Sequence, residues 1–455
     1  LPYQERVLVG LRRIPSDMTF KDGEHVLFLG DSITAYDGYP KWISDFYLTR
    51  YPERKIAFEP VGVSGDGVRW CGDRLGAEVI ARQPTSLTVM FGMNDIAHHL
   101  NEWTNGSPAR VRKNVSERVL SAYRGSFDAL ANRLSRELPN TRVYWLTPTP
   151  YDATTSVRSG QVNRPHVNSL LKTCAEHVGE HVRRDGGILI DLQGPMKSLS
   201  LACQTLDPDF TLNGPDRVHP DEHGYLFAAY EFVRQQGAAD FISDISVDAG
   251  TRMASAERAE VKQVSCTADA VRFSVREESL PMPIPKSAAK LGQAMDFDGK
   301  LNGQYLRVKG LETGKWTLAI DGEDLLTCSS EDWERGVNLA KCPTPQRRQA
   351  ETVVRINHER YGEPEFLLGR FRLARWAVRR WTSGSVDPDD LTAVKAYYDG
   401  LPPARQKGWP MSAVKHYLDN WSRREMLREA ATAIEKRARD AASPAEHAYG
   451  LRHVK

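Results

Sequence analysis

Short apolar runs alternate with longer amphipathic segments through the first half of the chain. The runs are rich in β-branched residues, which is typical of buried strands. The strand candidates are Val26–Leu29, Ile56–Glu59, Leu87–Phe91, Val143–Leu146 and Ile188–Asp191. The helix candidates are Tyr39–Arg50, Asp73–Arg82, Val111–Glu137, Arg164–Arg184 and His223–Gln236. Strands that alternate with helices predict right-handed βαβ units, and therefore an α/β fold with a parallel sheet flanked by helices.

The pattern changes near residue 246, where apolar and polar positions begin to alternate singly. This two-residue period, typical of half-buried strands, occurs in Ala270–Val275, Gln304–Val308 and Lys315–Ile320. Asp321 and Gly322 directly follow the last run and favour a tight hairpin. We therefore predict a small antiparallel β domain over residues 246–345.

The last part of the chain returns to helical spacing and is rich in arginine. Glu365–Trp381 carries apolar residues three and four positions apart, and Met411–Ala442 is expected to be another long helix. The sequence thus predicts three parts, which are an α/β domain over residues 1–245, a β domain over 246–345 and a helical region over 346–455.

Both appended parts allow a structural and a binding interpretation. The β domain is either a scaffold or a carbohydrate-binding module, and scaffold is favoured because no ligand-binding motif is visible. Trp376, Trp381, Trp409 and Trp421 could stack on sugar rings. Tryptophans at helical spacing more often belong to a core, so the structural interpretation is again favoured.

Composition narrows the class of protein. The 455 residues are 40% hydrophobic and 26% charged, and a net charge of +2 gives no reason to expect a nucleic-acid partner. The chain lacks a run of about 18 apolar residues, so no membrane span is expected.

Cys328 and Cys342 flank a short segment and are either paired or buried thiols. The first residue, Leu1, is compatible with a removed signal peptide or a trimmed sequence.

Candidate catalytic residues follow the predicted strands. The run Val26–Leu29 is followed closely by Ser32, which places a serine at the carboxyl end of the sheet, where open α/β folds bind ligands. A serine hydroxyl needs a base to accept its proton, and the base needs an orienting group. Far downstream, His219 and Asp216 supply a base and an orienting carboxylate on one short loop.

Two further segments carry donors suited to an oxyanion. Residues 62–66 form a glycine-rich turn, in which Gly65 can present a backbone N–H without an intervening side chain. Asn94 follows a strand candidate and can direct its amide to the same place. Each such donor is worth roughly 2.7–4 kcal/mol of activation barrier. Singly, Ser32 could be a helix N-cap, Asn94 a turn residue and His219 a surface histidine, but their order favours catalysis.

The motifs together resemble those of the SGNH (GDSL) hydrolase family. They are Gly-Asp-Ser at 30–32, Ser-Gly-Asp at 64–66, Gly-Met-Asn-Asp at 92–95 and Asp-Arg-Val-His at 216–219. The resemblance implies a flavodoxin-like sheet and ester hydrolysis without a metal. It further implies Ser32 as nucleophile, His219 as general base and Asp216 as its orienting partner. The implied oxyanion hole consists of the N–H groups of Ser32 and Gly65 and the side chain of Asn94.

We therefore expect a serine esterase that uses a Ser–His–Asp acyl-enzyme mechanism, with no metal and no cofactor. The favoured substrate is an acetylated oligo- or polysaccharide, because the chain resembles multidomain bacterial SGNH carbohydrate esterases and because no long apolar stretch flanks the site. A lipase, arylesterase or thioesterase is the first alternative, and a non-catalytic glycan-binding protein is the second.

Three further expectations are looser. A secreted or periplasmic location follows from the start at Leu1 and from the resemblance. The adjacent His98 and His99 are expected to serve a loop, because two neighbouring histidines rarely bind one metal without further ligands. The sequence leaves the oligomeric state open.

Overall fold

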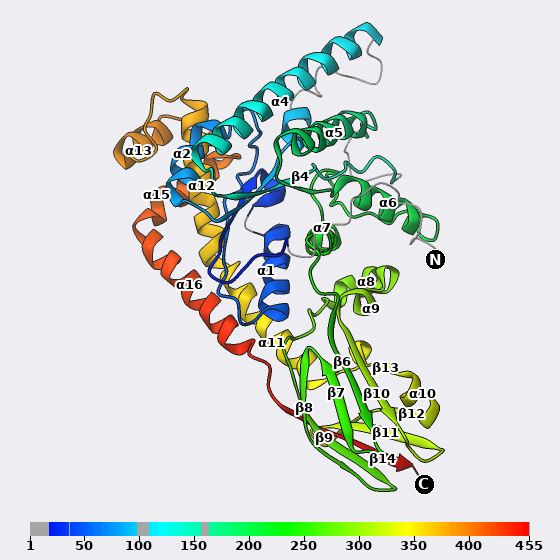
Figure 1. Cartoon of the computed structure of the whole chain (residues 1–455). Coiled ribbons are helices and arrows are strands. Elements are labelled where there is room, and N and C mark those ends of the chain that lie inside the picture. Colours follow the sequence, from blue (N-terminus) through cyan, green and yellow to red (C-terminus); the bar gives the residue numbers. More distant parts are fainter. Residues whose placement is uncertain (1–17, 36, 98–108, 156–162, 455) are drawn as a thin grey trace. The chain divides into compact units, whose positions relative to one another are not determined.

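The computed structural model describes residues 18–35, 37–97, 109–155 and 163–454. The chain forms two compact units (Figure 1). Unit 1 comprises Leu1–Ile43 and Ile56–Ala238, and unit 2 comprises Ser44–Lys55 and Ala239–Lys455. The expected division into three consecutive domains stays a prediction, whereas these two units are interleaved along the chain.

Unit 1 contains the expected parallel sheet. Its strand order is β2-β1-β3-β4-β5, and every neighbouring pair runs parallel. The strands are β1 (His25–Gly30), β2 (Ala57–Pro60), β3 (Ser86–Met90), β4 (Arg142–Leu146) and β5 (Ile188–Ile190). Leu27 pairs with Glu59 on one side and with Leu87 on the other, so β1 lies inside the sheet. The fold is therefore α/β, as the alternation of elements predicts.

The sheet is apolar on both faces because helices flank it, which is the usual arrangement for parallel strands. The residues Val26, Leu27, Phe28 and Leu29 have no exposed surface. The flanking helices are α2 (Gly72–Glu78), α3 (Met93–Ala97), α4 (Ala109–Glu137), α5 (Val167–Asp185), α6 (Gln193–Gln204) and α7 (Glu222–Gln235). The predicted helix over 73–82 is shorter than expected, since α2 ends at Glu78 and a 3-10 turn follows over Ile80–Arg82.

Unit 2 contains two sheets that share one hydrophobic core. The first has the order β13-β10-β6-β7 and the second the order β12-β11-β14-β9-β8. Their strands are β6 (Phe241–Asp248), β7 (Met253–Glu257), β8 (Ala259–Cys266), β9 (Ala270–Glu277), β10 (Gly303–Lys309), β11 (Lys315–Ile320), β12 (Glu323–Ser329), β13 (Val337–Asn338) and β14 (His447–Val454). Trp316, Phe273 and Leu306 meet in the core, so the sheets form a sandwich.

Two features of this sandwich differ from the sequence prediction. Strand β14 comes from the C-terminal region, which was expected to be helical, and it lies between β9 and β11. Strands β6 and β10 pair in parallel, so the β part is not purely antiparallel. Pairings between segments so far apart in the chain leave no mark on local periodicity, which is why the pattern did not indicate them.

The remaining part of unit 2 is helical. Its helices are α8 (Ala289–Met295), α9 (Phe297–Leu301), α10 (Ser330–Arg335), α11 (Pro345–Arg360), α12 (Glu363–Trp381), α13 (Leu391–Asp399), α14 (Pro403–Lys407), α15 (Met411–Asn420) and α16 (Arg424–Ala441). This was predicted for residues 346–455, whereas α8, α9 and α10 lie in the region that was expected to form only strands. The single helix expected over 411–442 is broken into α15 and α16 by a 3-10 turn at Trp421–Arg423. The Trp421 ring packs against Phe371 and Tyr417 there, and Trp376 is also largely buried.

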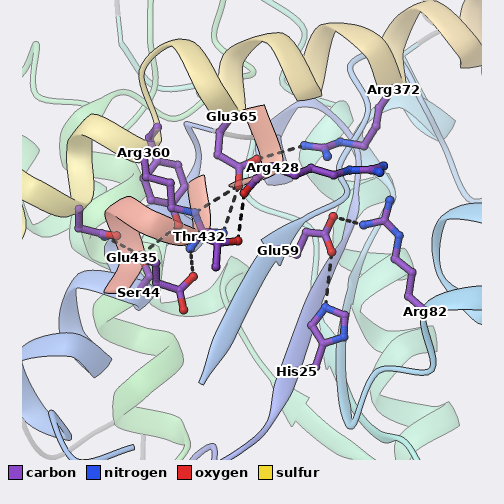
Figure 2. A network of polar contacts seen from close by, with 12 residues as sticks. His25, Ser44, Glu59, Arg82, Arg360, Glu365, Arg372, Arg428, Thr432 and Glu435 are labelled. Atoms are coloured by element: carbon purple, nitrogen blue, oxygen red, sulfur yellow. Dashed lines mark hydrogen bonds and ion pairs between the residues drawn. The ribbon is translucent and has the colours of Figure 1, made fainter. Parts of the chain in front are cut away.

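A buried ion network joins the long helices of unit 2 (Figure 2). Arg360 lies 3.1 Å from Glu365 and 2.5 Å from Glu435, and Arg372 approaches Glu365 at 3.6 Å. Buried charges are costly unless they are paired. These contacts therefore fix α11, α12 and α16 relative to one another within the unit. The same figure shows Glu59 of unit 1 with its own partners.

The second half of α1 (Tyr39–Arg50) is part of unit 2. The carboxylate of Asp45 is fully buried and accepts hydrogen bonds from Asn357 and His358, each at 2.7 Å. Leu48 packs in one apolar cluster with Val353 of α11 and Ala438 of α16. The N-terminal half of the sequence thus supplies a structural piece of the C-terminal unit.

Two expectations about the whole chain can be compared with the described residues. Cys328 and Cys342 are free thiols that pack against the core of the sandwich. Within the described part of the chain, no helix has the length and apolar character needed to cross a membrane.

Candidate active site

Ser32 lies at the carboxyl end of β1. The strand ends at Gly30, and Ser32 begins a short 3-10 turn whose N-cap is Asp31. The Asp31 carboxylate accepts the backbone N–H of Ile33 at 2.9 Å, which holds the turn in place. Ser32 is partly exposed, whereas Ile33 is buried. The turn therefore presents the serine hydroxyl at the edge of the sheet where ligands bind in open α/β folds.

Ser32, His219 and Asp216 form a continuous hydrogen-bonded relay. The Ser32 Oγ lies 2.7 Å from His219 Nε2, and the Asp216 Oδ2 lies 2.5 Å from His219 Nδ1. With the proton on Nδ1, the imidazole donates to the carboxylate and accepts the serine hydroxyl proton at Nε2. This is the geometry that activates a serine as a nucleophile.

The electrostatics of the pair suit a general base. Burial alone would raise the pKa of Asp216, but hydrogen bonds from the His219 ring and from the N–H groups of His219 and Val218 lower it to about 2. The pKa of His219 is raised because its ring donates to Asp216, and burial opposes this only in part. Asp216 is thus a stable carboxylate, and His219 is a stronger base than a free imidazole.

The loop that carries Asp216 and His219 is anchored by Arg217, which lies between them in the sequence. Arg217 has a positive φ of 68°, which non-glycine residues seldom adopt, and it is 1% exposed. Its guanidinium donates to the carbonyls of Asp152 and Thr155, each at 3.1 Å. Asn213 also donates to the Arg217 carbonyl, at 3.2 Å. These contacts anchor the loop that carries Asp216 and His219.

The glycine-rich turn passes directly against the backbone that carries Ser32. The N–H of Val63 donates to the Gly30 carbonyl at 3.1 Å. A Cβ on Gly62 would lie 2.7 Å from the Asp31 carbonyl oxygen, so only glycine fits there. Gly65 has a φ of +82°, a conformation that favours glycine. The turn therefore approaches the nucleophile through its backbone.

Asn94 ties the end of β3 to this turn. It lies in the first turn of α3 and is partly buried. Its Nδ2 donates to the Asp66 carbonyl at 2.8 Å. A primary amide carries two N–H groups, so one bond orients the side chain while the second N–H can serve an oxyanion.

The buried side chain of Arg74 also fixes the glycine-rich turn. Arg74 of α2 is 1% exposed, and its Nε donates to the Asp66 carboxylate at 2.8 Å. Its Nη groups donate to the carbonyls of Gly30 and Val61 at 3.1 and 2.6 Å, and Nη1 also reaches Glu78 at 3.0 Å. One guanidinium thus connects the carboxyl ends of β1 and β2 with the turn that follows β2.

The carboxylate of Asp95 fixes the C-terminal end of the glycine-rich turn. Asp95 is buried and accepts the N–H groups of Val68 and Arg69 at 3.2 and 3.4 Å. A Cβ on Gly67 would lie 2.7 Å from its Oδ1. Burial raises the pKa of Asp95 to about 7 despite these hydrogen bonds. The segment between Gly62 and Arg69 is therefore fixed at both ends.

The structure joins Ser32, His219 and Asp216, and it places Gly65 in the turn beside the nucleophile and Asn94 on that turn. The sequence prediction gave no role to Arg74, Asp95 or Arg217, which position the site. Asp95 and Arg217 lie inside the motifs at 92–95 and 216–219, whereas Arg74 lies outside them. Each of the three is a charged residue that is buried in the fold. The hydrophobic pattern of a sequence does not distinguish a buried charged residue from one on the surface.

Two other sequence expectations concern metals. His98 and His99 lie outside the described residues. In the part of the chain that the structure describes, there is no group of three or more His, Cys, Asp or Glu side chains that could hold a metal ion.

Comparison with known protein families identifies the segment that contains this site. The model of the GDSL-like lipase/acylhydrolase family matches residues 28–226. The match begins in β1, ends in α7 and includes Ser32, Asn94 and His219. This domain is an SGNH (GDSL) hydrolase. The parallel sheet flanked by helices is the one expected from the sequence.

Individual relatives of the SGNH hydrolase differ in how much of the chain they cover. An acetylxylan esterase from Geobacillus stearothermophilus is 24% identical over 235 residues, which are 48% of this chain and 97% of the relative. The crystal structure of Axe2, an acetylxylan esterase from the same organism, is 23% identical, covers 48% of this chain and 95% of its own, and has a TM-score of 0.38.

One solved structure resembles the SGNH hydrolase over its full length. A gut microbial diltiazem-metabolizing enzyme aligns with 97% of this chain and 100% of its own, at 27% identity and a TM-score of 0.85. The likeness includes the β sandwich and the helices of unit 2 as well as the hydrolase domain. The combination of these parts is therefore shared with that enzyme.

Proposed function

We propose that this SGNH hydrolase is a serine esterase that removes O-acetyl groups from carbohydrate. The observation that carries the proposal is the hydrogen-bonded relay from Ser32 through His219 to Asp216, at 2.7 and 2.5 Å. A non-catalytic glycan-binding protein would have no need of such a relay, so that alternative is not favoured.

In the first half of the proposed reaction, Ser32 Oγ attacks the ester carbonyl carbon while its proton moves to His219 Nε2. The carbonyl oxygen becomes an oxyanion, which the N–H groups of Ser32 and Gly65 and the amide of Asn94 stabilise. The C–O bond to the alcohol then breaks, and His219 donates its proton to the departing alkoxide. The acetyl group remains on Ser32.

In the second half, water replaces the alcohol. His219 takes a proton from the water as it attacks the acetyl carbon, and the same donors hold the second oxyanion. Acetate leaves, and the proton returns to Ser32 Oγ. Throughout, Asp216 keeps the imidazole in one tautomer and stabilises the transient imidazolium charge.

The acyl group is proposed from the relatives. One relative is named for acetylxylan, a polysaccharide that carries acetyl esters. The full-length relative is named for metabolising diltiazem. The acetyl ester in the first of these names supports a short-acyl preference for this chain. A secreted or periplasmic location remains part of the proposal, since an esterase acting on polysaccharide would meet it outside the cytoplasm.

The second candidate function is hydrolysis of acetyl esters on small non-carbohydrate alcohols. The full-length resemblance to a diltiazem-metabolizing enzyme favours it, because that likeness covers 97% of the chain, whereas the acetylxylan esterase matches 48%. The chemistry at Ser32 would be the same, so the two functions differ only in the alcohol that is released.

A substrate panel tests both candidates. Rates with acetylated xylo-oligosaccharides, diltiazem and p-nitrophenyl esters of two to twelve carbons should be highest for acetyl esters, with the saccharide preferred by kcat/KM. Ser32→Ala should abolish turnover of all of them, whereas Ser169→Ala, at an exposed serine of α5, should not change it. A preference for long acyl chains would refute the short-acyl proposal, and an active, folded Ser32→Ala protein would refute the mechanism.

A further inference from the structure

The outer face of the five-stranded sheet in unit 2 is hollowed. On β9, Val271, Phe273 and Val275 point into the core of the sandwich, so the residues between them face outward. The same alternation on β14 buries Tyr449 and Leu451. The outward positions in the middle of β14, Ala448 and Gly450, carry little or no side chain, and the sheet is therefore open above them.

The hollow has a volume of about 520 Å³ and spans β8, β9, β14 and β11. Its floor includes Ala448, Gly450 and Ala319, of which Gly450 pairs with Ala319 across the strands. A Cβ built on Gly450 would meet no atom within 4 Å. Space of this size accommodates one or two sugar rings, within the range of about 300–1,000 Å³ that is typical of ligand sites.

The polar groups of the hollow are suited to an anion. The residues that line it include Arg272 and Arg452 but no Asp or Glu. Arg452 pairs with Asp324, whereas the exposed Arg272 has no ion-pair or hydrogen-bond partner among the described residues. The Oγ of Ser274, a residue that is 8% exposed, also lacks a partner within the described structure. A buried hydroxyl normally makes a hydrogen bond.

We propose that this hollow binds a uronic-acid residue of a saccharide, with the sugar carboxylate on Arg272 and ring hydroxyls on Ser265 and Ser274. Guanidinium is the group best matched to a carboxylate, because it can donate two parallel hydrogen bonds. The flat floor of alanine and glycine accepts the C–H face of a sugar ring. The proposal is independent of the reaction at Ser32.

The position of the hollow argues against an acidic peptide. Peptides commonly add to a free strand edge, fill an apolar groove or bind to a cluster of arginines. Here the floor strands β9, β14 and β11 are paired on both sides, so their backbone groups are already used. A single free guanidinium beside two hydroxyl groups suits a polyhydroxylated ligand with one carboxylate.

Calorimetric titration of the full-length Ser32→Ala protein tests the site without turnover. Tri-galacturonate should bind, and its methyl ester, which has the same shape but no charge, should bind at least about tenfold more weakly. Xylotriose and a glutamate-rich hexapeptide serve as the neutral and peptide controls. Binding of tri-galacturonate should weaken as salt concentration rises.

Three further variants locate the binding. Arg272→Gln removes the cation and Gly450→Leu fills the hollow, and each should weaken tri-galacturonate binding at least about tenfold. Arg276→Gln removes another exposed arginine from the same strand, outside the hollow, and should leave binding within about twofold. Because Arg272 is exposed, its substitution will not prevent folding even if the Gly450 variant is unstable.

Several results would overturn the proposal. They are no binding of tri-galacturonate, equal binding of its methyl ester, equal weakening by Arg276→Gln, or tighter binding of the peptide. Arg272→Gln in the protein with Ser32 intact should hydrolyse p-nitrophenyl acetate at the unaltered rate. Loss of saccharide binding with intact ester hydrolysis thus separates this site from the proposed esterase.

Discussion

The side-chain amide of Asn94 donates a hydrogen bond to the backbone carbonyl of Asp66 at 2.8 Å. This contact joins the end of β3 to the glycine-rich turn that lies against Ser32. One N–H of Asn94 thus fixes the turn, and we propose that the other donates to the oxyanion.

Asn94→Ala should lower kcat by about 10²–10³, with a smaller change in KM, because an oxyanion donor acts mainly in the transition state. Steady-state kinetics with an acetyl ester measure this. Asn94→Asp keeps the size of the side chain but replaces the amide donors with acceptors, and it should be as slow as the alanine variant. A change confined to KM would mean that Asn94 binds the ground state instead.

The pH profile should report the His219–Asp216 pair. The base acts when His219 is neutral, and its pKa is raised by the hydrogen bond to Asp216. Activity should therefore fall toward acid pH with a midpoint above the ordinary histidine value of about 6.5. In Asp216→Asn the raising interaction is lost, so the midpoint should move to lower pH while kcat falls. An unchanged midpoint would show that another group controls the acid limb.

Arg74→Met should cost both stability and rate. It leaves the Asp66 carboxylate buried without its cation, and breaking a buried pair typically costs about 3–5 kcal/mol. The turn that Asp66 belongs to should loosen, so kcat should fall more than KM rises. Urea unfolding and kinetics measure the two effects. Arg133→Met, which breaks a half-exposed pair with Glu137, should change stability by less than about 1 kcal/mol and leave kcat unaltered.

Asp31→Asn should stabilise the protein at alkaline pH. Burial raises the pKa of Asp31 to about 7, above the value of about 3.9 in an unfolded chain. The folded state therefore holds a proton that the unfolded state has lost, and stability falls as pH rises between these two values. Asparagine stays neutral and its oxygen can still accept the Ile33 N–H.

Thermal unfolding at pH 4 and pH 8 provides the measurement for Asp31. The asparagine variant should melt above the wild type at pH 8, and the gain should vanish near pH 4. Asp22→Asn, at an exposed aspartate, supplies the matched control. An identical difference in Tm at both pH values would mean that Asp31 is ionised in the folded protein across the whole range.

The α/β fold was predictable because its signals are local. A buried parallel strand such as β1 must be apolar on both faces, and the motif with Ser32 follows it immediately. The pairing of His219 with Asp216 was also predictable, since the two residues are close in sequence. Their contact with Ser32, 187 residues away from His219, was expected from the resemblance of the motifs to a known family.

The parts that escaped prediction depend on distant contacts. Strand β14 pairs with β9 and β11, although many helical residues separate it from them, and its own sequence has no turn signal that would link it to a sandwich. Arg74 looks like an ordinary charge on an amphipathic helix until Gly30 and Asp66 are placed around it. Only the folded structure shows that a charged side chain such as that of Arg74 is buried.

The inclusion of Ser44–Lys55 in unit 2 has a consequence for the order of folding during synthesis. This stretch leaves the ribosome long before Asn357 and His358, the partners of Asp45, have been made. Its apolar side chains, such as Leu48, remain exposed to solvent, or bound by a chaperone, until α11 and α16 have been synthesised. A truncation after residue 245 would leave this apolar surface exposed permanently, so the hydrolase domain should depend on the whole chain for its solubility.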